Sequence, residues 1–220
     1  MTAYGKTENL FTRDEATHKL NVGDFRRPDF DQIKKWLVTE KIDGTNIRLI
    51  WEPAIDGGAD APGRPERLRF GGKTDNAQIH ADLVTWLIEN ITTEKLRSVF
   101  PTTDAVIYGE GYGAGIQKGG HYSKTKQFIV FDVLVDGKWW LNWENTCDVA
   151  AKFGLKTVPF IGEMSLEAGV AMVRSGFDSV LAKEQTGEVV KAEGLVGRPV
   201  EALFDKKGQR LIIKIKTRDF

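Results

Sequence analysis

The chain is poor in the residues that build disulfide frameworks and multi-ligand metal sites. Among its 220 residues there are one cysteine, Cys147, and three histidines. A single cysteine excludes an internal disulfide scaffold and a zinc site built on several thiolates. The histidines His18, His80 and His121 are scattered and do not have metal-ligand spacing.

Long apolar runs and an excess of one charge are also lacking. No apolar stretch approaches the ~20 residues that cross a bilayer, and the N-terminal residues lack the apolar run of a signal peptide. Lys+Arg and Asp+Glu number 31 each, so the formal net charge is zero. A uniformly basic nucleic-acid binder is excluded, and any such affinity must come from local patches. We expect a soluble, cytoplasmic protein with no membrane partner.

Hydropathy patterns predict short strands broken by separate helices. Strands are predicted at residues 40–51 (after the Asp43-Gly44 turn), 68–70, 127–135 and 138–143, and from 188 onward. Helices are predicted after a cap at Asp75 or Asn76 and over residues 145–153 and 165–174. Residues 52–66, rich in proline and glycine, predict a surface loop. This order favours an α+β fold over a parallel doubly wound sheet, in a single domain over residues 1–220.

Two lysine motifs carry the chemistry. Lys41 lies beside the tight Asp43-Gly44 turn, which can aim its side chain rigidly into a pocket. Attack on phosphorus requires a neutral amine, which nearby cations and partial desolvation favour. Lys214 and Lys216 alternate with isoleucines, so both side chains are expected on one face of a strand. A phosphate between them would relieve their repulsion, although alternate lysines also commonly form a solvated face or blunt a sheet edge.

Five short segments resemble, in order, the motifs of the covalent nucleotidyltransferases, the superfamily of polynucleotide ligases and capping enzymes. They are residues 39–46 (TEKIDGTN), 107–113 (IYGEGYG), 131–133 (FDV), 193–196 (EGLV) and 214–216 (KIK). More narrowly, the chain resembles bacteriophage RNA ligases of the double-strand, nick-sealing branch, the RNA ligase 2-like family. The resemblance implies an α+β adenylation domain, with antiparallel sheets flanked by helices and the nucleotide pocket between them.

The resemblance implies an ATP-dependent RNA ligase with a lysyl-AMP intermediate on Lys41. AMP would pass to a 5′-phosphate RNA end, which is then sealed to a 3′-hydroxyl, with Lys214 and Lys216 as further catalytic residues. The implied nucleotide contacts are Glu40, Ile42, Asn46, Lys73, Glu110, Phe131, Glu193, Lys214 and Lys216. The residues implied to hold Mg²⁺ through water, with Mn²⁺ as an alternative, are Asp43, Glu110 and Glu193. The resemblance also suggests a viral source, with the protein acting in the host cytoplasm. We expect a monomer, although the sequence does not fix the oligomeric state.

Ordinary structural roles remain open for several of these residues. Phe131 lies in an apolar strand, and a buried phenylalanine needs no ligand. Asp43 can serve its turn alone, and glutamates usually face solvent.

The chain departs from the family pattern at two places. The usual nucleotide-contacting arginine has its nearest counterpart in Lys73, which cannot form a bidentate fork; Arg48 and Arg69 are alternatives. Only Thr217 to Phe220 follow the lysine pair, so no appended C-terminal domain is expected, and the grip on RNA is left open.

Two basic segments are candidates for binding nucleic acid. Residues 183–218 hold nine Lys/Arg and five Asp/Glu, and residues 111–127 hold three lysines in a glycine-rich stretch without an acid. The second segment can equally be a solvated loop. Rival functions are an ATP-dependent DNA ligase with the same nucleophile, a non-catalytic nucleic-acid-binding module and, less favoured, a GTP-using capping enzyme.

Overall fold

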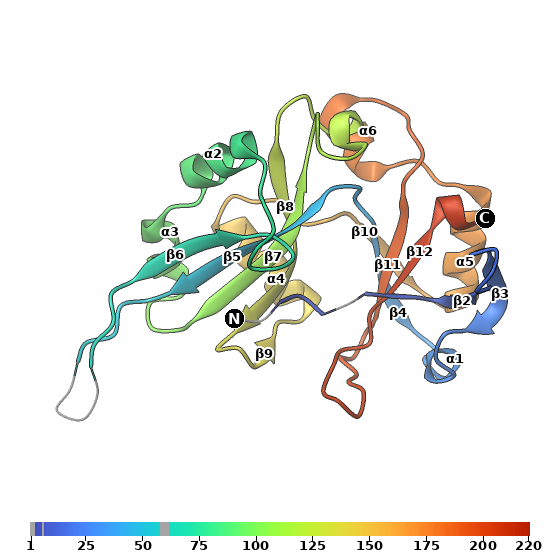
Figure 1. Ribbon diagram of the computed structural model, residues 1–220, viewed down its shortest axis with the longest axis horizontal. Helices are drawn as coiled ribbons and strands as arrows, with labels where there is room; N and C mark the ends of the chain where they lie inside the picture. Colours follow the sequence, from blue (N-terminus) through green and yellow to red (C-terminus); the bar gives the residue numbers. More distant parts are fainter. Residues whose placement is uncertain (1–2, 6, 58–61) are drawn as a thin grey trace. The chain divides into compact units, whose positions relative to one another are not determined.

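The structure is a computed structural model that describes residues 3–5, 7–57 and 62–220. It divides into two compact units, each formed by separate stretches of chain (Figure 1). Unit 1 comprises Met1–Tyr4 and Asp43–Thr157, and unit 2 comprises Gly5–Ile42 and Val158–Phe220. The chain therefore passes from unit 2 to unit 1 immediately after Lys41 and Ile42. None of the helices in the described part is long and apolar enough to cross a membrane.

Unit 1 contains a five-stranded antiparallel sheet with three helices packed on one face. In sheet order its strands are β6 (Arg67–Gly71), β5 (Thr45–Glu52), β7 (Ala105–Tyr112), β8 (Gln127–Val135) and β9 (Trp139–Trp140). The helices are α2 (Ala81–Asn90), α3 (Thr93–Val99) and α4 (Trp143–Lys152), with a short 3₁₀ turn, η1, at Gly119–His121. Apolar side chains of β5, β7 and β8 share one core with all three helices.

Strand alternation in β5 separates an apolar face from a polar one. Ile47, Leu49 and Trp51 lie in the core under the helices. Because neighbouring side chains in a strand point to opposite faces, Asn46 and Arg48 lie on the face away from the helices.

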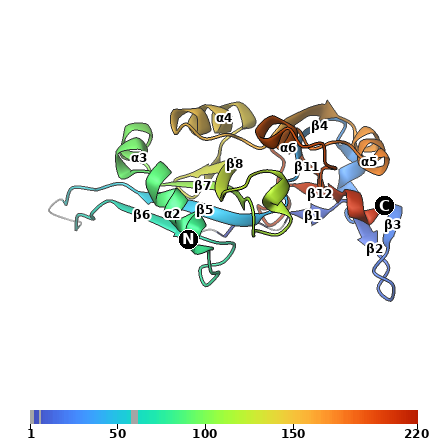
Figure 2. The same ribbon diagram turned by 90° about the horizontal axis from the view of Figure 1, so that it is seen from above.

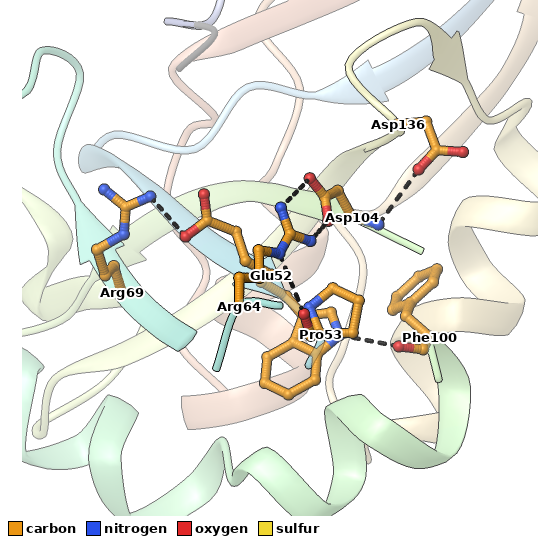
Figure 3. A network of polar contacts seen from close by, with 8 residues as sticks. Glu52, Pro53, Arg64, Arg69, Phe100, Asp104 and Asp136 are labelled. Carbon is orange, nitrogen blue, oxygen red and sulfur yellow. Dashed lines mark hydrogen bonds and ion pairs between the residues drawn. The ribbon is translucent and has the colours of Figure 1, made fainter. Parts of the chain in front are cut away.

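A polar network closes the base of the loop between β5 and β6 (Figure 3). Arg64 donates to the carbonyl of Pro53 at 3.2 Å and to both carboxylate oxygens of Asp104. The backbone N–H of Asp104 in turn donates to Asp136 Oδ1 at 3.2 Å. The predicted surface loop is thus anchored at its base; residues 58–61 of that loop lie outside the described residues.

Unit 2 contains a second five-stranded sheet and a two-stranded one. In sheet order the first has β1 (Glu8–Asn9), β12 (Ile213–Lys216), β11 (Gly194–Pro199), β4 (Trp36–Glu40) and β10 (Phe160–Met164); β1 and β12 pair in parallel and the other pairs are antiparallel. The second has β2 (Phe11–Arg13) and β3 (Leu20–Phe25). The helices are α1 (Asp29–Gln32), α5 (Leu166–Ser175), α6 (Val180–Thr186) and the 3₁₀ turn η2 (Thr217–Asp219). Helix α5 packs on β11 and β12 (Figure 2).

The α+β fold with antiparallel sheets, predicted from the sequence, is confirmed. The Asp136-Gly137 turn joins β8 to β9 with φ values of 50° and 64°, the positive values that tight hairpin turns require. Ser165 caps α5 by accepting a hydrogen bond from Ala168 N, and Gly176 ends that helix at φ 70°. Both helix boundaries agree with the sequence prediction within one or two residues.

One predicted strand and one predicted helix start are wrong. The predicted strand at residues 138–143 is reduced to β9, because Asn142 accepts from the N–H of Asn145 and begins α4 instead. The residues proposed as caps for a helix, Asp75 and Asn76, precede α2 by a whole turn, and α2 begins at Ala81. Asp75 accepts instead from Arg48 Nη2 at 2.8 Å.

Candidate active site

Lys41 lies in a charged cluster at the end of β4 in unit 2. Its Nζ is 2.6 Å from Glu193 Oε2, and Lys216 Nζ is 2.8 Å from Glu193 Oε1. The side chains of Lys41, Glu193 and Lys216 are 20%, 14% and 16% exposed. One carboxylate therefore compensates two ammonium groups that would otherwise repel each other at short range.

Gly194 explains why the carboxylate of Glu193 reaches both lysines. A Cβ at position 194 would lie 2.0 Å from the carbonyl oxygen of Ile215 and 2.8 Å from Lys216 Cα, and Gly194 has φ +151°. Only glycine permits this approach of β11 to β12. Gly194 also pairs with Lys216 in the sheet and accepts from the backbone N–H of Lys41 at 2.9 Å. These backbone contacts of Gly194 thus hold its neighbour, Glu193, between Lys41 and Lys216.

The two lysines of β12 leave the strand on one face, as the alternation predicts. Ile213 and Ile215 are buried in the unit 2 core, whereas Lys214 and Lys216 are half-buried and line a common pocket. They do not form a fully solvated face.

Glu40, predicted as a nucleotide contact, is buried and its carboxylate is occupied at the N-terminus of α6. It accepts hydrogen bonds from the Ser179 hydroxyl and from the N–H groups of Val180 and Leu181, at 2.9 and 3.1 Å for the last two. Burial raises the pKa of the Glu40 carboxyl, although these three donors oppose the shift. A nucleotide contact by Glu40 stays a prediction.

Replacing Glu40 by glutamine should change how stability depends on pH. A raised pKa means that the folded chain binds the Glu40 proton more tightly than the unfolded chain, so wild-type stability falls as pH rises from the ordinary value of 4.5 through the raised value. Glutamine does not titrate. We expect chemical denaturation between about pH 4 and 8 to show that, as the pH rises, the unfolding free energy of the Glu40→Gln variant increases relative to that of wild type. The difference should become constant once Glu40 of the folded wild type is fully ionised. A difference that does not vary with pH would contradict this assignment.

In unit 1, two polar residues predicted to bind the nucleotide lie opposite each other. Asn46 on β5 pairs in register with Glu110 on β7, on the sheet face away from the helices. The Oδ1 atom of Asn46 is buried and accepts no hydrogen bond within the part of the chain that the structure describes. A buried acceptor without a donor is costly, and a ligand that brings a donor would satisfy it. Nucleotide contacts by Asn46 and Glu110 stay predictions.

The turn after Lys41 is held by close backbone packing. A Cβ on Gly44 would lie 2.4 Å from the carbonyl oxygen of Gly111, so glycine is required for this approach. The N–H of Asp43 points to the Tyr122 hydroxyl at 3.3 Å. Tyr122 lies in the loop between β7 and β8, and its side chain thus contacts the turn.

That glycine-rich loop is folded on itself. The N–H of Ala114 donates to the carbonyl of Ser123 at 3.0 Å, and Ile116 is buried in the unit 1 core. Lys118 and Lys124 are exposed, whereas Lys126 pairs with Asp82 at 3.4 Å. A role of this loop in nucleic-acid binding stays a prediction.

The arginine alternatives to Lys73 have structural partners. Arg48, 1% exposed, donates from Nε to the Gly72 carbonyl at 2.7 Å and from Nη2 to Asp75; its guanidinium holds the pKa of Asp75 below the usual range. Arg69 pairs with Glu52 at 3.1 Å. Arg48 therefore shapes the turn from which the exposed Lys73 projects, and a nucleotide contact by Lys73 stays a prediction.

Phe131 lies outside both apolar cores. The register between β7 and β8 shifts at Tyr108 and Gly109, which leaves Phe131 as the extra residue of a bulge. Its ring meets the Tyr4 ring edge-on at 5.0 Å, and the Tyr4 hydroxyl donates to the buried Asp132 at 2.8 Å. Phe131 thus packs on Tyr4 outside the two cores, and its stacking on adenine stays a prediction.

The three carboxylates predicted to serve a metal do not form a ready-made site. Within residues 3–5, 7–57 and 62–220, no group of three acidic, histidine or cysteine side chains lies close enough to hold a metal ion. Both oxygens of Glu193 are engaged by lysines, so Glu193 does not fit as a direct ligand. Asp43 and Glu110 belong to unit 1 and are half-buried. Water-mediated binding of Mg²⁺ by Asp43, Glu110 and Glu193 stays a prediction, as does the contact by the buried Ile42.

Solved structures of the RNA ligase from Naegleria gruberi share this fold. A ligand-free form superposes with a TM-score of 0.66 at 18% identity, covering 98% of this chain and 56% of that chain. Forms solved with ATP and manganese and with AMP and manganese give TM-scores of 0.67 at 18% identity, covering 98% and 99% of this chain and 56% of the other. This chain therefore spans a little more than half the length of those proteins. The likeness shows the fold of an RNA ligase adenylation domain.

Comparison of sequences gives the narrower result. No curated protein matches the chain. The sequence model of the RNA ligase family matches residues 34–216, a span that runs from β4 to the end of β12 and includes all five motif segments. With its lysine cluster inside that span, the chain belongs to the RNA ligase family.

Proposed function

We propose that the chain is an ATP-dependent RNA ligase that carries AMP on Lys41. The observation that supports this most strongly is the Lys41–Glu193–Lys216 cluster in a chain of the RNA ligase family. Lys41 itself directly follows the last residue of β4. The short ion pair with Glu193 fixes the position of the Lys41 amine in a largely buried cluster, and a nucleophile needs such positioning.

The proposed reaction has three balanced steps. The Lys41 ammonium loses one proton to solvent, and the resulting amine bonds to the α-phosphorus of ATP and loses a second proton to solvent, while the bond to pyrophosphate breaks and pyrophosphate leaves with the electron pair. An oxygen of the RNA 5′-phosphate then attacks this phosphorus, and the bond to Lys41 Nζ breaks as that nitrogen takes up a proton from solvent. Finally the RNA 3′-hydroxyl attacks the 5′-phosphorus and gives its proton to solvent, while AMP leaves with the electron pair of the broken bond. In each step Lys216, and Lys214 on the same face of β12, would stabilise negative charge on phosphate oxygens.

The unit 1 residues would hold the nucleoside. Asn46 offers a buried acceptor without a donor, and Glu110 across from it has oxygens for ribose hydroxyls. Only five peptide units separate Lys41 from Asn46, so their Cα atoms lie within about 18 Å in any arrangement of the chain. The Naegleria ligase has been solved with ATP and with AMP, each with manganese, which supports ATP and a divalent metal here, Mg²⁺ or Mn²⁺. When bound, the metal would neutralise charge on the phosphates.

Intact-protein mass spectrometry after incubation with ATP and Mg²⁺ tests the first step. We expect a mass increase of one AMP, mapped by peptide analysis to Lys41, with GTP giving no adduct. Absence of an adduct, together with retained binding of RNA, would leave the chain as a non-catalytic nucleic-acid-binding module.

Sealing assays test the acceptor and the branch of the family. We expect sealing of a nicked duplex with RNA at the 3′-hydroxyl side, as the resemblance to the nick-sealing phage branch implies. Equal sealing with DNA on that side would identify a DNA ligase with the same nucleophile. Sealing of single strands alone would contradict the proposed branch.

Asn46→Ala separates nucleotide binding from folding. The wild-type amide oxygen is buried without a donor. Removing it should therefore lower the unfolding free energy of the nucleotide-free protein by no more than about 1 kcal/mol. The KM for ATP in adduct formation should rise roughly tenfold, because one hydrogen bond to the ligand is lost. Thermal unfolding without ATP measures the first effect, and the rate of adduct formation at increasing ATP concentrations measures the second. A large loss of stability without ATP, at an unchanged KM, would make Asn46 a structural residue.

A further inference from the structure

A pocket of about 440 Å³ in unit 2 lies beside the lysine cluster and is only partly used by the proposed reaction. Among the described residues that line it are four cationic side chains, Arg13, Lys214, Lys216 and Arg218, and one carboxylate, Asp219. The lining thus carries a net of three positive charges. Lys216 is shared with the cluster around the nucleophile, since it also pairs with Glu193.

The cations reach this pocket from three separate segments. Arg13 ends β2, the two lysines belong to β12, and Arg218 lies in the 3₁₀ turn η2. Bringing like charges together costs energy in the free protein, because the same charges spread over the surface would repel each other less. A ligand with several negative charges offsets that cost, so the arrangement has the character of an anion site.

Arg13 is held in place before any ligand binds. Its Nη2 is 2.6 Å from Asp219 Oδ1, and its Nη1 donates to the His18 carbonyl at 2.9 Å. The side chain of Asp219 is 7% exposed and that of Arg13 34% exposed. A guanidinium has five N–H donors, so these two bonds leave donors for a ligand. A fixed planar guanidinium suits the bidentate geometry of phosphate.

His18 is placed at the pocket by a tight turn with unusual backbone geometry. Its φ is 57°, which is uncommon for a residue other than glycine. Asp14 Oδ1 holds the turn by accepting from both the N–H and the hydroxyl of Thr17, each at 2.7 Å. Asn9, paired with Lys214 across β1 and β12, adds an amide to the wall. The described residues of the lining are therefore all polar, and Arg13 among them is held by its contacts with Asp219 and His18.

We propose that this pocket binds phosphate groups adjacent to the reacting one, with Arg13 and Arg218 as binding residues that the five motifs do not include. The inference rests on the proposed function for its ligand class. The phosphates can come from the 5′ end of the RNA strand or from the β,γ-phosphates of ATP, which share the same chemistry.

Binding measurements on single-site variants test the pocket without any turnover. Fluorescence anisotropy with a 5′-phosphorylated RNA oligonucleotide should show Arg13→Gln raising the dissociation constant roughly tenfold. The negative slope of the log association constant against log salt concentration should become shallower by about 0.7, because one phosphate contact is lost. Asp219→Asn removes the negative charge but keeps an acceptor oxygen, so binding should be equal or tighter. Arg27→Gln is the matched control, because Arg27 pairs with Asp29 and Asp205 and does not line the pocket.

Two further arms identify the source of the phosphates. If they belong to RNA, the loss in Arg13→Gln appears with 5′-phosphate and not with 5′-hydroxyl RNA. If they belong to ATP, it appears as a raised KM for ATP in adduct formation and as weaker binding of inorganic tripolyphosphate. Either result supports the pocket.

Unchanged binding of RNA and of tripolyphosphate in Arg13→Gln would overturn the proposal, as would equal weakening by Asp219→Asn, which indicates a purely structural ion pair. If Arg13→Gln fails to fold, the double variant Arg13→Gln/Asp219→Asn leaves no unpaired carboxylate and answers the same question. Since anisotropy needs no AMP adduct, failure of lysyl-AMP formation would leave this readout intact and separately interpretable.

Discussion

Replacing Lys41 by arginine is expected to abolish AMP attachment while leaving the fold intact. Arginine keeps the positive charge and can keep the ion pair with Glu193, which in the wild type spans 2.6 Å. It cannot supply a neutral amine, because a guanidinium stays protonated in proteins. We therefore expect the rate of adduct formation to fall by at least about 10⁴-fold, with an unfolding free energy within about 1 kcal/mol of wild type.

Radiolabelled ATP and urea denaturation measure the two quantities on the same preparation. Lys41→Ala serves as a companion, since it removes both the amine and the ion pair and should lose stability as well as activity. AMP attached to the arginine variant at a rate near wild type would place the nucleophile elsewhere and end the lysyl-AMP proposal for Lys41.

Replacing Glu193 by glutamine is expected to slow adduct formation by about 10²-fold, because the lysines lose their common anchor. The carboxylate accepts from Lys41 on one oxygen and from Lys216 on the other, at 2.6 and 2.8 Å. An amide has one acceptor and presents donors to the second ammonium, so one lysine must move. Glu193 acts here as a positioning residue, and the loss should fall on kcat more than on the KM for ATP.

The control for Glu193 is the same substitution at a surface ion pair in unit 2. Glu163 pairs with Lys35 at 3.4 Å, and both side chains are exposed, so Glu163→Gln should change neither rate nor stability measurably. If Glu193→Gln lost only stability, with kcat for adduct formation unchanged at low temperature, the bridge would be structural and would not position the nucleophile.

Local features of the structure follow from short stretches of sequence. The Asp136-Gly137 pair predicts its hairpin because few residues adopt positive φ without strain. Ser165 and Gly176 delimit α5 by the chemistry of helix ends. Alternation alone placed Lys214 and Lys216 on one face of β12. Helix α6 was not predicted, although Ser179 caps its start and Gly187 ends it in the left-handed conformation; only the structure shows that the distant Glu40 also accepts from its first N–H groups.

The candidate site is less local. The sequence by itself determines the order of the motifs and the chemistry available to their lysine, glutamate and glycine residues. That order already indicates an RNA ligase. Only the tertiary structure decided that Glu193 joins Lys41 to Lys216, and that Arg13 meets Asp219 at 2.6 Å across 206 residues of chain. Such contacts depend on how closely strands approach, as at Gly194 against Ile215, and packing between distant segments has no signature in neighbouring residues.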